Sequence, residues 1–363
     1  MSAERLFDPF LLKSLDLKTR IVMAPMTRSM SPDGVPPSAA AGYYARRAAA
    51  DVGLVITEGT VVDRPTAAND PNVPKFYGYD ALTAWRPVVE QVHAAGSMIA
   101  PQLWHVGSAQ PSKGEWTAHS SLESPSGLVR PDEPHGEPMS ESAIADVIAA
   151  FVGSAAAARR LGFDAIQLHG AHGFLFDQFF WPALNRRTDG WGGATVAERS
   201  RFAAETVRAI RAAVGEDMAL LFRISQFKTQ DYNARIAHTP AELEAWLGAL
   251  ADAGVDLFDC SQRRFWDPEF EGSDLNLAGW AKKLTGRPTI TVGSVGLTAE
   301  FVTADAGRPD SLAALLRRHE RGEFDLVGVG RALLSDPTWA KTIRGGRFDQ
   351  VRDYDPAALG SLH

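Results

Sequence analysis

One short segment of the sequence brings two histidines together in a way that suggests chemistry. His169-Gly-Ala-His172-Gly directly follows a short apolar run, and its glycines let the backbone turn both imidazoles towards one point. Two N–H donors that converge on an oxygen stabilise negative charge that develops there in a transition state. The pair can equally bind a metal ion if His105 or a more distant acid is a third ligand, or be purely structural. The motif alone leaves these three interpretations open.

Two glycine-rich segments near the C-terminal end are suited to bind a phosphate. Gly293-Ser294 lies within ITVGSVG, and Gly330-Arg331 ends VGVGR. Closely spaced backbone N–H groups bind anions, and the arginine fork holds two phosphate oxygens at once. The alternative is that the glycines only make tight turns and that Arg331 pairs with a surface acid.

Arg223 follows the apolar run Leu220-Leu221-Phe222, so its charge emerges from a buried wall. A buried arginine needs an anionic partner because an unpaired buried charge is costly. That partner is either a carboxylate of the protein itself or an electron-rich ligand such as a reduced flavin.

The elements that must position these residues follow one repeated pattern. An amphipathic helix ends at a glycine and a short apolar strand follows, because glycine adopts the left-handed conformation that closes a helix. The pattern occurs at Gly96, Gly162, Gly215, Gly254 and Gly322. Helix starts are equally clear, with capping residues at Ser140, Thr195 and Thr239.

Eight strands are expected, near 21–26, 52–58, 98–103, 164–169, 218–224, 256–260, 288–292 and 325–329. Strands without alternation that are separated by helices predict an α/β fold, a single-domain (β/α)8 TIM barrel over residues 1–363. An open doubly wound sheet is the rival, but no G-x-G-x-x-G turn follows the first strand. The segment 107–139 is expected to be a long loop. In such a barrel the chemistry lies at the C-terminal ends of the strands.

Composition excludes several other classes of protein. The 363 residues carry 37 Lys and Arg against 44 Asp and Glu, a net charge of −7, which argues against a general binder of nucleic acid. Cys260 is the only cysteine, so disulfides, cysteine zinc sites and protein-bound iron–sulfur clusters are excluded, and we expect it to be buried and inert. We find neither a secretion signal nor an 18-residue apolar window, and therefore expect a cytoplasmic enzyme for a small molecule, without a membrane partner.

Seven blocks of the sequence, in order, resemble the Old Yellow Enzyme family. They are MAPMTR (23–28), ITEGT (56–60), PQLWHVG (101–107), HGAHGFLFDQFF (169–180), NRRTDGWGG (185–193), FRIS (222–225) and VGVGRALLSDP (327–337). The resemblance implies an FMN-dependent NAD(P)H ene-reductase, with NADPH or NADH as reductant and hydride transfer from flavin N5 to an activated C=C bond. Relatives are monomers or homodimers and have no separate Rossmann domain for the nicotinamide.

The resemblance also implies roles for individual residues. Thr27, His169 and His172 would be catalytic, the histidines as donors to the carbonyl or nitro oxygen of the substrate. The expected cofactor-binding residues are Pro25, Met26, Thr27, Gly59, Gln102, His169, Arg223, Gly293, Ser294, Gly330 and Arg331. The expected substrate-binding residues are His169, His172, Tyr77, Trp104, Phe174 and Phe265. No metal site is expected.

One residue departs from the family pattern. The family has a tyrosine after H-G-A-[NH]-G that gives a proton to the α-carbon, and this chain has Phe174. Water or a displaced donor (Tyr77, Tyr79 or Tyr232) would then protonate the product. Alternatively, the reaction is a nitro or nitrate-ester reduction or a desaturation that needs no such donor, or the protein is a flavoprotein with little turnover. A metal-dependent barrel hydrolase that uses His169 and His172 is the alternative from a different class.

Overall fold

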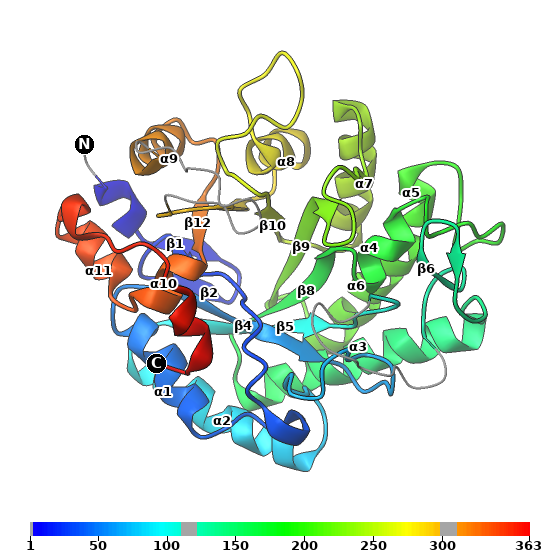
Figure 1. Ribbon diagram of the computed structural model, residues 1–363, viewed down its shortest axis with the longest axis horizontal. Helices are drawn as coiled ribbons and strands as arrows, with labels where there is room; N and C mark the ends of the chain where they lie inside the picture. The colour runs from blue at the N-terminus through cyan, green and yellow to red at the C-terminus, as the bar shows by residue number, and fades with distance from the viewer. Residues whose placement is uncertain (1–2, 110–121, 298–310) are drawn as a thin grey trace.

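Eight parallel strands close into a barrel in the computed structural model, which describes residues 3–109, 122–297 and 311–363 (Figure 1). Around the barrel the strands follow one another in chain order, and the last pairs with the first. They are β3 (Ile21–Met23), β4 (Leu54–Val61), β5 (Met98–Trp104), β8 (Ala165–His172), β9 (Ala219–Lys228), β10 (Leu257–Ser261), β11 (Thr289–Val292) and β12 (Leu326–Val329). The predicted (β/α)8 barrel is confirmed, and the open sheet is excluded because the closed ladder has no edge strand.

Helices surround the barrel and begin and end largely where the sequence indicates. The longer ones are α1 (Ala39–Ala48), α2 (Tyr79–Ala94), α3 (Glu141–Leu161), α6 (Arg201–Val214), α7 (Pro240–Ala253), α8 (Leu277–Thr285) and α9 (Ser311–Glu320). The short ones are α4 (Leu175–Phe180), α5 (Val196–Arg199), α10 (Arg331–Ser335) and α11 (Trp339–Arg344). The hydroxyl of Ser140 accepts the Ala143 N–H at 3.1 Å, and Thr195 forms a complete capping box with Glu198. Gly162 and Gly254 close their helices in the left-handed conformation, as expected.

An apolar plug fills the N-terminal end of the barrel. Six of the eight barrel strands contribute one or two large buried side chains, and β5 and β8 contribute the small residues Ala100 and Ala165. The hairpin of β1 (Phe10–Leu12) and β2 (Leu15–Leu17) adds Leu15 and Leu17 to this cluster from below. Because this end is filled by packed side chains, a ligand can enter only from the opposite end, where the strands finish.

The long segment after β5 is held to the barrel by Glu123, just beyond its undescribed part. It contains the small hairpin of β6 (Leu128–Arg130) and β7 (Glu133–Pro134), and residues 110–121 of the expected 107–139 loop lie outside the described part of the chain. Glu123 forms an ion pair with Arg64 and accepts hydrogen bonds from Thr66 and His105. This cluster joins the loop to the ends of β4 and β5.

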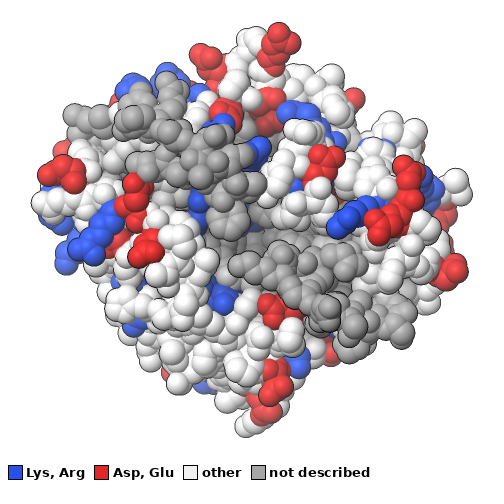
Figure 2. Space-filling view, viewed as in Figure 1, with Lys and Arg blue, Asp and Glu red and all other residues white. Residues whose placement is uncertain are grey.

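The surface in the orientation of Figure 1 mixes both signs of charge. Figure 2 shows Lys and Arg side chains interspersed with Asp and Glu over the described part of this face. The expectation that the sequence has no 18-residue apolar window is wrong for one helix. The 21-residue helix α3 contains an 18-residue window with a mean hydropathy of 1.4, enough in length and composition to cross a membrane. In this structure α3 packs on the barrel through Ile144, Val147 and Phe151, which are fully buried.

Candidate active site

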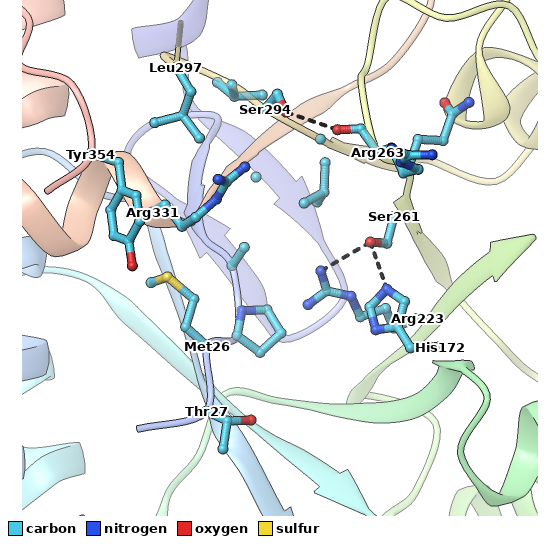
Figure 3. A pocket seen from close by; sticks show the side chains of 18 of the residues that line it. Met26, Thr27, His172, Arg223, Ser261, Arg263, Ser294, Leu297, Arg331 and Tyr354 are labelled. Atoms are coloured by element: carbon cyan, nitrogen blue, oxygen red, sulfur yellow. Dashed lines mark hydrogen bonds between the residues drawn. The ribbon is translucent and has the colours of Figure 1, made fainter. Parts of the chain in front are cut away.

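A cavity of about 390 Å³ opens at the C-terminal end of the barrel (Figure 3). Nine of the residues expected to bind cofactor or substrate line it: Pro25, Met26, Thr27, His172, Arg223, Gly293, Ser294, Gly330 and Arg331. They come from the ends of β3, β8, β9, β11 and β12, which lie far apart in the sequence. The fold therefore brings the candidate phosphate-binding segments and one of the two histidines to a single site.

His172 is held by its backbone and by its ring. It has φ +65°, an uncommon conformation for a residue with a side chain. Its N–H donates to Ser225 Oγ at 2.9 Å, and its carbonyl accepts the N–H of Thr229 at 3.2 Å. The ring Nε2 lies 2.9 Å from Ser261 Oγ, and Figure 3 shows Ser261 between His172 and Arg223. These contacts point the imidazole along the cavity wall.

His169 lies one layer deeper and faces its partner. The two imidazole rings are 5.3 Å apart and nearly perpendicular. His169 is only 7% exposed, and its Nδ1 has no hydrogen-bond partner among the described residues. Trp104 stacks on it at 6.0 Å, and Phe174 meets it edge-on at 4.8 Å. A buried ring nitrogen without a protein partner is a group that a ligand can satisfy.

Both imidazoles are neutral at ordinary pH. Burial lowers the pKa of His169 well below its usual value, and the charges of His172 and Arg223 lower it further. Burial likewise lowers the pKa of His172, with further contributions from Arg223 and Lys228. A neutral imidazole carries one N–H and no net charge. Each ring can therefore donate one hydrogen bond while it stays in its neutral form.

Arg223 brings a positive charge to the site, and it is only partly paired. Its Nε lies 3.7 Å from Asp259 Oδ2, and its Nη2 lies 3.5 Å from Ser261 Oγ. That Nε has no hydrogen-bond partner among the described residues, although the side chain is buried. The structural ion pair that the sequence left open therefore exists, with Asp259, but it leaves the Nε without a hydrogen bond in a residue that also lines the cavity. An acceptor on a bound ligand would satisfy it.

The amide of Gln102 is part of a buried chain beneath the cavity. Gln102 Nε2 donates to Gln167 Oε1 at 2.8 Å, and Gln167 Nε2 donates to Asp259 Oδ2 at 2.8 Å. Burial raises the pKa of Asp259, against the opposing effect of Arg223. Gln102, expected to contact a cofactor, is thus linked to Arg223 through two other side chains. Sequence reasoning missed Gln167 and Asp259 because each lies inside a strand, where nothing distinguishes it from a core polar residue.

The other end of the cavity has the form of an anion site. Gly293 has φ +153°, and a Cβ at this position would lie 2.5 Å from the carbonyl oxygen of Gln262, so no larger residue fits. Gly330 precedes α10, and Arg331 is its first residue, with the guanidinium 5.6 Å from the ring of Tyr354. Figure 3 shows Arg331 and Arg223 on opposite sides of the cavity. Two arginines on opposite sides of one cavity fit a ligand with a phosphate at one end and an electron-rich ring at the other.

The remaining expected residues lie outside the residues that line this cavity. Gly59 supports Trp104, because a Cβ on Gly59 would come within 2.7 Å of the indole. Tyr77 lines a separate cavity together with Asp33 and Lys75. Phe265 is fully buried and packs edge-on against Trp266 at 5.0 Å.

Several lining residues were not among the expected cofactor or substrate contacts. They are Phe227, Thr229, Tyr232, Ser261, Arg263, Tyr354 and Leu359. The ring of Phe227 lies 5.1 Å from His172, and Tyr232 stacks on Phe227 at 5.7 Å. Their position at the C-terminal end of β9 and just beyond it is the only sequence signal for this pair. Tyr354 and Leu359 come from the C-terminal segment, which Arg28 holds by donating to three of its carbonyls, and no motif indicates that contact.

His105, the third ligand considered for a metal, is used elsewhere. Its Nε2 lies 2.8 Å from Glu123 Oε2, and its Nδ1 accepts the Gly107 N–H at 3.0 Å. Across residues 3–109, 122–297 and 311–363, no group of three His, Cys, Asp or Glu side chains could hold a metal ion. Cys260 is buried, and burial raises the pKa of its thiol well above the usual value, which keeps it in the unreactive thiol form.

Comparison with known proteins identifies the class to which this barrel belongs. Residues 5–350 match the model of the NADH:flavin oxidoreductase / NADH oxidase family. Among curated relatives, a "probable inactive dehydrogenase easA" of Claviceps fusiformis is 35% identical over 75% of this chain and 71% of its own length. NADPH dehydrogenase of Bacillus velezensis is 32% identical over 94% of both chains. Morphinone reductase, solved in complex with tetrahydroNAD, superposes with a TM-score of 0.77 at 27% identity, covering 98% of this chain and 93% of that one.

The chain belongs to the NADH:flavin oxidoreductase / NADH oxidase family. It is accordingly an FMN-dependent NAD(P)H oxidoreductase, as the resemblance implied. The cavity between Arg223 and Arg331, with its unsatisfied arginine nitrogen and its glycine cradle, fits this cofactor.

Proposed function

We propose that this protein reduces activated C=C bonds, with His169 and His172 as the pair of N–H donors to the carbonyl or nitro oxygen of the substrate. The observation that carries the proposal is the pair itself: two neutral imidazoles, 5.3 Å apart, beside a cavity that suits FMN. Neutral donors strengthen their hydrogen bonds as charge grows on the substrate oxygen, so they favour the transition state over the bound substrate. Each good donor of this kind contributes about 3–4 kcal/mol.

FMN, when bound, supplies the group that accepts hydride from the nicotinamide and delivers it to the alkene. In this proposal the backbone and hydroxyl of Gly293 and Ser294, with Gly330 and Arg331, hold the phosphate. Arg223 pairs with the electron-rich edge of the ring system, and Pro25, Met26 and Thr27 lie against it. The buried, unsatisfied Nε of Arg223 supports this role.

The walls of the cavity favour a flat, largely apolar substrate. His172, Phe227 and Tyr232 line the cavity and form a continuous series of ring contacts. Trp104 and Phe174 pack around His169, outside the lining residues. Aromatic walls of this kind bury planar groups well. Morphinone reductase, by its name a reductase of morphinone, has the same fold at 27% identity.

The proton that completes the reduction cannot come from Phe174. Its ring packs edge-on against both His169 and Trp104 at 4.8 Å and carries no hydroxyl that could give a proton. Among the tyrosines considered as replacements, Tyr232 lines the cavity, whereas Tyr77 lines another and Tyr79 is 83% exposed. We propose that the proton comes from solvent or from Tyr232. General acid catalysis accelerates such a step by ~10²–10⁴-fold but is not essential to it.

Phe174 also favours a second candidate function, the reduction of nitro groups or nitrate esters, because these reactions need no α-proton donor. The relative whose name reads "probable inactive dehydrogenase" supports a third outcome, a flavoprotein with little turnover. These three functions differ in what the protein does after its flavin has been reduced.

Anaerobic stopped-flow measurements distinguish them. The holoprotein is reduced with NADPH or NADH and then mixed with cyclohex-2-enone, a nitroalkene or a nitrate ester. The proposal predicts reoxidation by the enone, a slower rate in Tyr232→Phe if that hydroxyl is the donor, and a rate at least about tenfold higher in Phe174→Tyr. Solvent deuterium at the α-carbon identifies water as the source. No reoxidation by any acceptor in either the wild type or Phe174→Tyr would refute an ene-reductase.

We also propose the wider setting of the activity. The whole chain, residues 1–363, would act as one FMN-binding domain in the cytoplasm, as a monomer or homodimer, without nucleic-acid or membrane partners. The mixed surface charge and the burial of the apolar face of α3 support this assignment. Gel filtration with light scattering would establish the oligomeric state.

A further inference from the structure

A buried ion pair lies directly behind the candidate donor His172. Asp177, in the first turn of α4, and Lys228, the last residue of β9, are 1% and 0% exposed at their side chains. The Lys228 Nζ lies 2.7 Å from Asp177 Oδ1 and donates to the carbonyl of Gln226 at 2.6 Å. Neither residue is among the lining residues of the cavity, so the pair cannot act by touching the substrate.

The pair is bonded to the backbone that carries His172. The second carboxylate oxygen of Asp177, Oδ2, accepts the N–H of Gly173 at 3.0 Å. On the other side, Lys228 is the register partner of His172 in the β8–β9 ladder, and the next residue, Thr229, donates to the His172 carbonyl. Asp177 and Lys228 therefore clamp the chain on both sides of the point where β8 ends.

The backbone at that point needs such a clamp. His172 and Gly173 are consecutive residues with φ +65° and +86°. A residue with a Cβ is strained in this region and stays there only when the surroundings over-determine it. If the Gly173 N–H lost its acceptor, the relaxed backbone would rotate the imidazole away from the cavity.

An ion pair is an expensive way to fill this space. Burying two charges costs more than packing two apolar side chains of similar volume, and replacement by apolar residues is often neutral. Asp177 shows the cost, because burial raises its pKa to about 6 against the opposing effects of Lys228 and of the Gly173 N–H. Packing alone therefore does not explain this pair. The hydrogen bond that Asp177 accepts from Gly173 gives it a specific task.

We propose that Asp177 and Lys228 are positioning residues for His172: Asp177 accepts the Gly173 N–H and so fixes the left-handed turn, and Lys228 keeps this carboxylate in place and neutralises it. The inference rests on the proposed donor role of His172. It adds two residues that act on the reaction through another side chain.

Two double variants separate the hydrogen bond that Asp177 accepts from Gly173 from the effect of burying two charges. Asp177→Asn/Lys228→Met removes both charges but keeps an oxygen that can accept the Gly173 N–H. Asp177→Leu/Lys228→Met removes both charges and the acceptor at nearly the same volume. The matched control is Arg211→Met/Asp256→Asn, which breaks another buried ion pair, between α6 and the start of β10 at the closed end of the barrel.

The first measurement uses protein stripped of flavin. Amide hydrogen exchange of a peptide spanning 170–175 is expected to accelerate at least about tenfold in the leucine variant, and to stay within about threefold of the wild type in the asparagine variant and in the control. Equal exchange in the leucine variant and the wild type would overturn the proposal. If the leucine variant does not fold, Asp177→Ala/Lys228→Met lacks the same acceptor and is subject to the same expectation.

The second measurement uses the FMN-loaded protein and cyclohex-2-enone. The leucine variant is expected to lose at least about tenfold in the rate of flavin reoxidation, since a displacement of about 1 Å can cost ~10²-fold, while its dissociation constant for FMN stays within about twofold. The asparagine variant should recover most of this rate. A parallel loss of FMN affinity, or no recovery by asparagine, would show a merely structural pair and refute positioning.

Failure of the proposed function gives a different pattern. If His172→Ala reoxidises as fast as the wild type, His172 is not a donor and the proposed function fails at that residue. The exchange of the Gly173 amide would still report whether Asp177 and Lys228 hold the turn. The two hypotheses can therefore fail separately.

Discussion

The substitution Glu58→Gln is expected to remove one pH-dependent contribution to the free energy of unfolding, which comes from the buried carboxyl of Glu58. Glu58 lies in β4, 6% exposed, and its Oε2 accepts the N–H of Arg28 at 2.8 Å, one residue beyond Thr27. Burial raises the pKa of Glu58 from 4.5 to about 7, although the backbone N–H groups of Arg28 and Ser29 oppose this. Glutamine keeps an acceptor for the Arg28 N–H and cannot ionise.

The magnitude follows from linkage between protonation and folding. Glu58 binds its proton more tightly in the folded protein, so its contribution to stability is full below pH 4.5 and is lost as pH rises towards 7. The difference of about 2.5 units between the two pKa values corresponds to about 3.4 kcal/mol over the whole titration of Glu58. Of this, about 2.5 kcal/mol of the free energy of unfolding is lost between pH 5 and pH 8.

The assay is urea unfolding of the flavin-free protein at pH 5 and pH 8, followed by tryptophan fluorescence. Asp177 and Glu269 contribute pH dependence in the same direction, and they cancel when the variant is compared with the wild type at each pH. Between pH 5 and pH 8 the free energy of unfolding of Glu58→Gln should fall by about 2.5 kcal/mol less than that of the wild type. Glu244→Gln, at an exposed position of α7, is the control and should change nothing. Equal pH dependence in Glu58→Gln and the wild type would refute the reasoning.

Three further predictions follow from single residues. Gly59→Ala places a Cβ 2.7 Å from the indole of Trp104, so we expect a loss of about 1–3 kcal/mol in stability by thermal or urea unfolding, and slower alkene reduction as well. Hydrogen bonds from His105 and Arg64 outweigh the burial of Glu123 and lower its pKa to about 2. Its contribution to stability is present above pH 4.5 and is lost as the pH falls towards 2. In Glu123→Gln the free energy of unfolding should therefore depend less on pH between 4.5 and 2. Arg223→Met removes the partly paired guanidinium, and we expect the affinity of the flavin-free protein for FMN, measured by fluorescence quenching, to fall at least about tenfold through the loss of a charge-assisted hydrogen bond. An unchanged affinity would show that Arg223 does not contact the cofactor.

The fold was accessible from the sequence because its determinants are local. Each strand is an apolar run between helices, and glycines such as Gly162 and Gly254 end helices through their own conformation. Eight such units permit few topologies, so the barrel follows without knowledge of any long-range contact. The ends of the strands also follow, and with them Arg223, His172 and the glycines of the anion site.

The sequence could not show which side chains at the strand ends line the same cavity. Gln102, Tyr77 and Phe265 have suitable residue types, yet the first turns towards Gln167, the second lines another cavity and the third lies in the core. Side-chain direction depends on the register and twist of neighbouring strands, which no local pattern encodes.

Long-range partners were equally hidden. Arg28 binds the carbonyls of a segment more than 300 residues away, which gives the cavity Tyr354 and Leu359. Lys228 meets Asp177 across two strand ends, and a lysine and an aspartate in the sequence look like ordinary surface charges until burial is known. The sequence by itself determined the barrel and the kinds of group at its mouth, because propensity and periodicity are local. Only the tertiary structure decided which groups converge, which remain unsatisfied and which hold the donor His172 in its strained conformation, because desolvation and pairing arise only when distant segments meet.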